Sequence, residues 1–137
     1  GMDEDCLHLN IRSRAETPNE KLPSMVWIHG GALVTGEGAA YSGVELTKQG
    51  IVLITINYRL GLFGYLAHEE LSAEHPQGVS GNRGVRDQIQ ALARGRDNIS
   101  AFGGDPDNVT IFGESAGSCS VCLLPACPMA KGYFTKQ

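Results

Sequence analysis

The residues of this chain that are best suited to catalysis by their types and spacing are five consecutive small or polar ones, Gly113-Glu114-Ser115-Ala116-Gly117. They match the spacing G-x-S-x-G, in which a strand turns sharply into a helix and presents a serine hydroxyl at the turn. Such a turn strains the backbone and leaves the flanking positions room for little more than hydrogen. Gly113 and Gly117 provide that room, so Ser115 is a candidate nucleophile. The alternative is a Gly/Ser-rich turn without chemistry.

The residues on either side of this motif favour the first interpretation. Val109 to Phe112 is a β-branched and aromatic run, typical of a strand, and Ala116 to Leu124 is a helical pattern that stops before Pro125. Ser115 would then lie at a helix N-terminus, where free N–H groups stabilise developing negative charge.

A second motif, His29-Gly30-Gly31-Ala32, directly follows the short apolar run Ser24 to Ile28, which indicates a buried strand. Two glycines without side chains can direct backbone N–H groups at a substrate oxygen and so form an oxyanion hole. Each such donor typically contributes about 2.7–4 kcal/mol to a transition state. A plain Gly-Gly turn is the alternative. His29 is itself a candidate catalytic residue, but a role in holding the shape of the loop by hydrogen bonds is favoured.

The remaining pattern places these motifs in an α/β fold. Residues 6–11 alternate like a half-buried strand, and 51–56 form an apolar run typical of a strand buried on both faces. Residues 82–102 form the longest helical pattern, interrupted by Gly95. Strands that alternate with helices predict a mainly parallel sheet flanked by helices. Ser115 would lie at the carboxyl end of a strand, where ligands bind in such sheets. Loops with at most short helices are expected at 13–23, 34–48 and 67–81.

Composition restricts the classes of function and partner. A chain of 137 residues suggests one domain, and its net charge of −4 gives no basic field for nucleic acid or an anionic membrane. No apolar run approaches the roughly 18 residues of a membrane-spanning helix, and the acidic first five residues do not resemble a signal peptide.

Three features each have a chemical and a structural interpretation. Cys119 and Cys122 form a C-x-x-C that could serve redox or metal chemistry, but within a helix they are expected to pack as small hydrophobic residues, so no metal is predicted. Arg59 could bind an acidic substrate, although a structural hydrogen-bonding role is favoured. The four arginines between Arg83 and Arg96 could form a polyanion site, but a solvated helix face is favoured.

Several segments together resemble the type-B carboxylesterases, a family that includes cholinesterases and bacterial para-nitrobenzyl esterases, and the chain is more similar to the bacterial kind. The segments are Glu4-Asp5-Cys6-Leu7, Trp27 to Ala32, Asn57-Tyr58-Arg59-Leu60-Gly61, Gly81-Asn82, Asp87-Gln88, Asn98-Ile99, Phe102 to Pro106 and Gly113 to Gly117.

The resemblance implies an α/β-hydrolase fold and hydrolysis of a small-molecule ester through an acyl-serine, with no cofactor. Ser115 matches the nucleophile of the family, and the backbone N–H groups of Gly30, Gly31 and Ala116 match its oxyanion hole. Glu114 matches a residue that supports the site and is not the triad acid. The bacterial likeness favours a cytoplasmic location, with secretion of a full-length protein left open, and no oligomeric state is predicted.

The chain departs from the family pattern at two places. The long helix carries Arg94-Gly95 where the family usually has Trp-Val, which predicts a local disturbance of that helix. In this fold the triad runs Ser, then Asp or Glu, then His, but no residue after Ser115 is Asp, Glu or His. We therefore expect residues 1–137 to be an internal fragment of a single α/β-hydrolase catalytic domain, with the triad acid and histidine outside it.

Two further hypotheses remain from the sequence. One is a catalytically inactive, cholinesterase-like protein used for binding or adhesion, although inactive relatives often lose the serine that is intact here. The other is an esterase that uses an upstream histidine such as His29 or His75 as its base.

Overall fold

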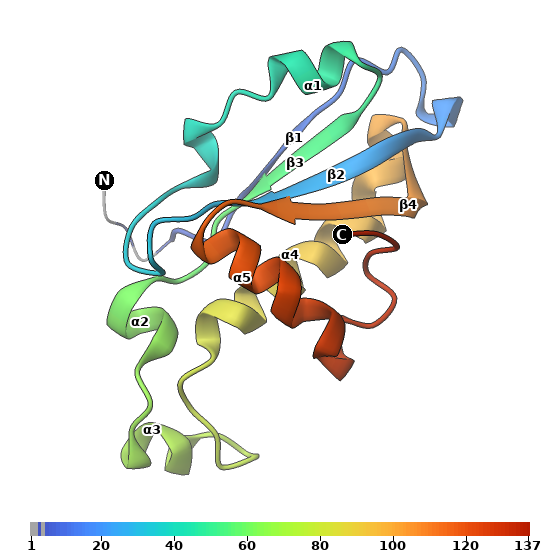
Figure 1. Cartoon of the computed structure of the whole chain (residues 1–137). Coiled ribbons are helices and arrows are strands. Elements are labelled where there is room, and N and C mark those ends of the chain that lie inside the picture. The colour runs from blue at the N-terminus through green and yellow to red at the C-terminus, as the bar shows by residue number, and fades with distance from the viewer. Residues whose placement is uncertain (1–2, 4) are drawn as a thin grey trace.

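A mixed sheet with the strand order β1-β3-β2-β4 forms the centre of the chain (Figure 1). The computed structural model describes residues 3 and 5–137. Residues 1, 2 and 4 of the acidic N-terminal stretch, and with them the Glu4 of the resemblance, lie outside the described residues. The strands are β1 (Leu9–Arg12), β2 (Leu22–Ile28), β3 (Val52–Ile56) and β4 (Gly104–Gly113). The α-helices are α1 (Val44–Lys48), α2 (Gly61–Tyr65), α3 (Glu69–Glu74), α4 (Arg83–Asn98) and α5 (Ala116–Leu123).

The two strands that precede the chemical motifs are direct neighbours. Strand β2 pairs in parallel with both β3 and β4, whereas β1 pairs antiparallel with β3. In the register of β2 and β4, Trp27 lies opposite Phe112 and Ile28 opposite Gly113. Because parallel strands end at the same edge of a sheet, the chain leaves β2 and β4 side by side.

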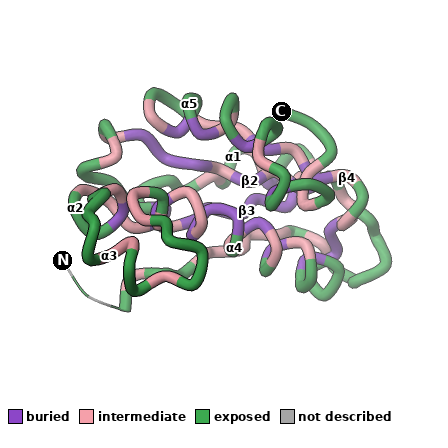
Figure 2. Tube along the Cα trace, turned by 90° about the horizontal axis from the view of Figure 1, so that it is seen from below, coloured by how far each residue is buried: buried purple, intermediate pink, exposed green. Residues whose placement is uncertain are grey.

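The core lies between the sheet and the helices α4 and α5, with the segment that follows α5 packed on it. Strand β3 is buried along its whole length (Figure 2), because it is central and carries apolar or β-branched residues at every position. Ile28 and Ile111 are both fully buried, and Leu92 of α4 is 1% exposed. Full burial of one such side chain typically stabilises the fold by about 1.5–3 kcal/mol. Helices α4 and α5 cover one side of the sheet and α1 the other (Figure 1).

The predicted strands and the long helix are confirmed, with different bounds. Strand β1 begins only at Leu9, and β4 begins at Gly104, earlier than expected. Helix α4 ends at Asn98 and continues as a 3-10 helix (Ile99–Phe102), which Gly103 closes with a left-handed φ of 77°. Helix α2 was not predicted, because it is short and carries two glycines. The first residues of β4 were not predicted either.

The expected disturbance of the long helix at Arg94-Gly95 is wrong, because α4 is continuous through both residues. Gly95 is buried against the sheet, and a Cβ there would lie 3.0 Å from Cδ1 of Ile54. The glycine allows helix and sheet to approach closely at this point. The expectation for the cysteines is also wrong, since Cys119 and Cys122 are both exposed.

Arg59 has the structural role that was favoured. Its Nε and Nη2 each donate to the carboxylate of Asp87 at 2.7 Å, and its backbone N–H donates to the same carboxylate at 3.0 Å. Asp87 is buried on α4, so this charged pair ties the segment after β3 to that helix. Among the described residues, no helix has both the length and the apolar character to cross a membrane.

Candidate active site

Ser115 occupies a strained turn between β4 and α5. Its backbone φ is 54° and its ψ is −122°, a conformation that residues with a side chain rarely adopt. Ser115 is the N-cap of α5 and is exposed, so its side chain is accessible at the N-terminal end of that helix. Strand, strained serine and helix follow one another as the G-x-S-x-G spacing predicts.

The two glycines of the motif are required by close backbone contacts. A Cβ on Gly117 would lie 2.0 Å from the carbonyl oxygen of Ile28, and a Cβ on Gly113 would lie 2.6 Å from the carbonyl carbon of Gly117. Both distances are far below van der Waals contact. The first turn of α5 therefore packs directly on the end of β2, which only glycine permits at these positions.

The loop after β2 lies against the serine turn. A Cβ on Gly30 would lie 3.0 Å from Cβ of Ser115, 2.8 Å from the carbonyl oxygen of Glu114 and 2.7 Å from its Oε2. Gly30 and Ser115 are thus immediate neighbours in space, although they are far apart in sequence. The structure brings together the two motifs that the sequence singled out.

The backbone of this loop is left-handed at three consecutive residues. Gly31, Ala32 and Leu33 have φ values of 102°, 55° and 63°. The carbonyl oxygen of Gly31 accepts from the N–H of Val34 at 2.9 Å and of Thr35 at 3.1 Å, which closes a tight turn. Strain of this kind persists only where the surrounding structure fixes it, and it is concentrated at functional sites.

Several polar groups around Ser115 have no partner within the described part of the chain. The N–H groups of Gly30, Gly31 and Ala116 donate to no acceptor among residues 3 and 5–137. Gly30 adjoins the side chain of Ser115, Gly31 is the next residue of the same loop, and Ala116 follows Ser115 in the chain. Free N–H donors from two separate loops are what the predicted oxyanion hole requires.

His29 lies beneath the loop and not beside the serine. It is 1% exposed, its Nδ1 lies 2.7 Å from the carbonyl oxygen of Gly30, and its ring stacks on Tyr58 with centroids 4.5 Å apart. A Cβ on Gly36 would lie 2.4 Å from that Nδ1, so the loop encloses the ring. The carbonyl can only accept, so Nδ1 carries the proton.

None of the histidines of the described chain forms a hydrogen bond with Ser115. Nε2 of His75 lies 2.6 Å from Nη1 of Arg86, which can only donate, and Nδ1 of His68 accepts from the N–H of Glu70. The hypothesis of an upstream histidine as base therefore has no support in this arrangement.

The sequence interpretation did not assign a role to Tyr58, which contacts the site directly. Its hydroxyl donates to the carbonyl oxygen of His29 at 2.7 Å, and burial raises the pKa of Tyr58 to about 12. The signal that could have found it is its place in the Asn57-Tyr58-Arg59 segment at the end of β3, the neighbouring parallel strand.

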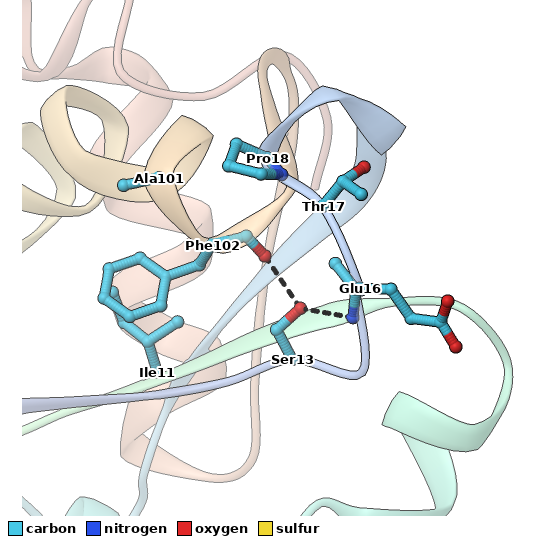
Figure 3. A pocket seen from close by; sticks show the side chains of 8 residues that line it. Ile11, Ser13, Glu16, Thr17, Pro18, Ala101 and Phe102 are labelled. Carbon is cyan, nitrogen blue, oxygen red and sulfur yellow. Dashed lines mark hydrogen bonds between the residues drawn. The ribbon is translucent and has the colours of Figure 1, made fainter.

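One hollow of the structure lies at the other end of the sheet from Ser115. It has a volume of about 330 Å³ and is lined by Ile11 of β1, by residues of the loop after β1 and by the 3-10 helix before β4 (Figure 3). Ser13 bridges its wall, donating to the carbonyl of Phe102 at 2.7 Å and accepting from the N–H of Ala15. This hollow is at the amino ends of β2 and β4, whereas Ser115 follows the carboxyl end of β4. Within residues 3 and 5–137, no cluster of three His, Cys, Asp or Glu side chains could hold a metal.

Comparison with known proteins gives consistent matches over the whole chain. The family model described as "Carboxylesterase family" matches residues 1–137. The chain is 52% identical over 136 residues to the para-nitrobenzyl esterase of Bacillus subtilis (strain 168), covering 97% of the chain and 27% of that protein. It is 46% identical over 138 residues to the fumonisin B1 esterase of Sphingopyxis macrogoltabida, covering 99% of the chain and 26% of that protein.

Solved structures agree with this result. A crystal structure of a Geobacillus stearothermophilus carboxylesterase superposes with a TM-score of 0.88 at 48% identity, covering 96% of the chain and 28% of that structure. The chain therefore spans about a quarter of the length of the curated relatives that it matches.

Proposed function

Because this chain belongs to the carboxylesterase family, we propose that it is the nucleophile-bearing part of a serine ester hydrolase. The observation that supports this most directly is the contact between the two motifs, in which Gly30 adjoins the side chain of the strained Ser115. The residues form part of one α/β-hydrolase catalytic domain, and its triad acid and histidine lie outside this chain. The longer protein that contains them is called the full-length protein below.

In the proposed reaction, the Ser115 hydroxyl oxygen attacks the carbonyl carbon of a small-molecule ester. The serine proton passes to the histidine, and the carbonyl oxygen becomes an oxyanion held by the N–H groups of Gly30, Gly31 and Ala116. The histidine then protonates the leaving alcohol, which gives an acyl-serine. Water, activated by the same histidine, releases the acid and restores the enzyme. The reaction needs no cofactor.

The local structure suits each of these roles. The strained φ of Ser115 directs its side chain out of the turn, and the N-terminus of α5 contributes partial positive charge at the same point. Glu114 places its carboxylate beside Gly30, where it supports the loop. Because no described histidine contacts Ser115, we expect the 137-residue chain alone to be a poor catalyst.

A burst experiment on the full-length protein tests the proposal. The wild-type protein should release one equivalent of nitrophenol rapidly from a nitrophenyl ester and should be labelled covalently by a fluorophosphonate. Ser115→Ala should abolish both signals, while Ser100→Ala, which changes an exposed serine in the 3-10 helix before β4, at the opposite end of that strand, should retain both. Full turnover in Ser115→Ala would contradict the proposal. A wild-type protein that resists the fluorophosphonate would instead indicate an inactive binding protein.

A further inference from the structure

Each N–H group of the proposed oxyanion hole belongs to a peptide unit whose carbonyl is held by another group. In a planar trans peptide the C=O and the following N–H point in opposite directions, so fixing one fixes the other. The described chain contains no cis peptide bond. The carbonyl of Ser115, which shares a unit with the N–H of Ala116, accepts from the hydroxyl of Ser118 at 2.7 Å and the N–H of Cys119 at 3.1 Å.

Side chains perform the same task for the two glycines. The unit that joins His29 to Gly30 has its carbonyl held by the Tyr58 hydroxyl at 2.7 Å. The unit that joins Gly30 to Gly31 has its carbonyl held by Nδ1 of His29, also at 2.7 Å. The two donors are themselves one stacked pair, with their rings 20° from parallel. The Gly30 and Gly31 N–H groups are therefore directed away from Tyr58 and His29.

Tyr58 belongs to a segment that contacts the loop at two further points. The side-chain oxygen of Asn57 accepts from the N–H of Gly38 at 2.8 Å, and the N–H of Gly61 donates to the carbonyl of Leu33 at 2.6 Å. The segment is itself tied to α4 through Arg59 and Asp87. It is thus a rigid support along which the left-handed loop is held.

We propose that Tyr58 is a positioning residue for ester hydrolysis, which sets the direction of the Gly30 N–H through its hydrogen bond to the carbonyl of His29. The effect on ester hydrolysis rests on the proposed function, whereas the effect of Tyr58 on the orientation of the Gly30 N–H does not. Tyr58 touches neither substrate nor the reacting atoms. Its effect is to hold one oxyanion donor in place before the substrate binds. A donor fixed in advance stabilises the transition state more, because it need not reorient during the reaction.

The chain provides a matched control in Tyr65. Both tyrosines have a pKa raised to about 12, chiefly by burial. The Tyr65 hydroxyl is buried but has no hydrogen-bond partner among the described residues, whereas that of Tyr58 has one. Tyr58→Phe and Tyr65→Phe therefore remove the same atom from similar surroundings, and only the first releases a carbonyl of the oxyanion loop.

The test compares the two variants in the full-length protein. Tyr58→Phe should lower the acylation rate constant about tenfold. It should also lower, about tenfold, the affinity for a trifluoromethyl ketone, which forms a tetrahedral oxyanion on serine. The reason is that removal of one oxyanion-hole donor typically costs about 10²–10³-fold in rate, and a loosened donor loses part of that. The dissociation constant of the ester, measured from the substrate dependence of the acylation burst, should change less than about twofold, since the ground-state ester makes weaker use of the hole. Tyr65→Phe should match wild type in the acylation rate constant, in the affinity for the trifluoromethyl ketone and in the binding of the ester.

A second readout does not depend on catalysis. The amide resonance of Gly30 should shift in Tyr58→Phe and stay in place in Tyr65→Phe. If wild type is not acylated, the proposed function fails while this resonance still decides the role of Tyr58. Should Tyr58→Phe not fold, Tyr58→3-fluorotyrosine, a stronger donor of the same shape, should move the resonance. Equal kinetics in both variants, or an unmoved Gly30 resonance, would overturn the inference.

Discussion

The contact between α5 and the end of β2 predicts a large effect from the smallest change that can be made there, Gly117→Ala. The added Cβ would lie 2.0 Å from the carbonyl oxygen of Ile28, 2.8 Å from its carbonyl carbon and 2.9 Å from the carbonyl oxygen of His29. All three neighbours are backbone atoms of the last residue of β2 or of the first residue of the loop that follows it. None can move aside as a flexible side-chain end would.

The size of the effect follows from that geometry. Even to bring the nearest contact from 2.0 Å to 3.0 Å, the serine turn and the end of β2 must separate by about 1 Å. Overpacking of this kind typically costs about 1–3 kcal/mol of stability. A displacement of about 1 Å between catalytic groups can lower a rate about 100-fold. The separation would move Ser115 away from Gly30, and in the proposed reaction both act on one carbonyl group.

Steady-state hydrolysis of a nitrophenyl ester and thermal unfolding of the full-length protein measure the two effects. We expect kcat/KM of Gly117→Ala to fall about 100-fold or more while the protein remains folded. Gly95→Ala is the control, because Gly95 is also a buried helical glycine but meets only the end of the Ile54 side chain, at 3.0 Å. There the gain in helix propensity, about 1 kcal/mol, should offset the free-energy cost of a small shift of the Ile54 side chain. Wild-type activity in Gly117→Ala would refute the argument.

Two further changes probe neighbouring features of the same structure. Gly30→Ala should lower kcat at least tenfold and also lower stability by about 1–3 kcal/mol, because Gly30 is buried and its Cβ would lie 2.8 Å from the backbone oxygen of Glu114 and 3.0 Å from Cβ of Ser115; an unchanged kcat would contradict a role of this loop in catalysis. Burial raises the pKa of Tyr58 and of Tyr65 from 10.0 to about 12, so the folded state holds their protons more tightly than the unfolded state. Stability should therefore be complete below pH 10 and decline as the pH rises toward 12. Chemical denaturation across this range, with tyrosinate followed by ultraviolet absorbance, should show one ionisation fewer coupled to unfolding in Tyr65→Phe.

Much of this arrangement can be predicted from local patterns. The buried run at 51–56, the glycines of the serine turn and the apolar face of the long helix each have a physical reason that is visible in the sequence. These patterns predict the strands and the α/β class. They also predict that the two motifs are adjacent, because the loops that follow parallel strands lie at the same edge of a sheet. The family is likewise indicated by motifs alone.

Other features depend on contacts between distant segments and could not be predicted from local patterns. The role of Gly95 depends on the position of Ile54 on the sheet, and its departure from the family pattern therefore suggested a local disturbance where the helix is continuous. The exposure of Cys119 and Cys122 depends on what covers α5, which helical periodicity does not reveal. The place of Tyr58 at the end of β3 could have drawn attention to it, but its contact could not be predicted, because its hydrogen-bond partner is a backbone carbonyl and every residue has one.

In the proposed reaction, Ser115 and three backbone N–H groups act on a single carbonyl group. A crystal structure of the full-length protein after reaction with a fluorophosphonate tests this most directly. We expect a phosphorus–oxygen bond to Oγ of Ser115, with the phosphonyl oxygen about 2.7–3.1 Å from the N–H nitrogens of Gly30, Gly31 and Ala116. An adduct on another residue, or a phosphonyl oxygen that turns away from the Gly30–Gly31 loop, would contradict it.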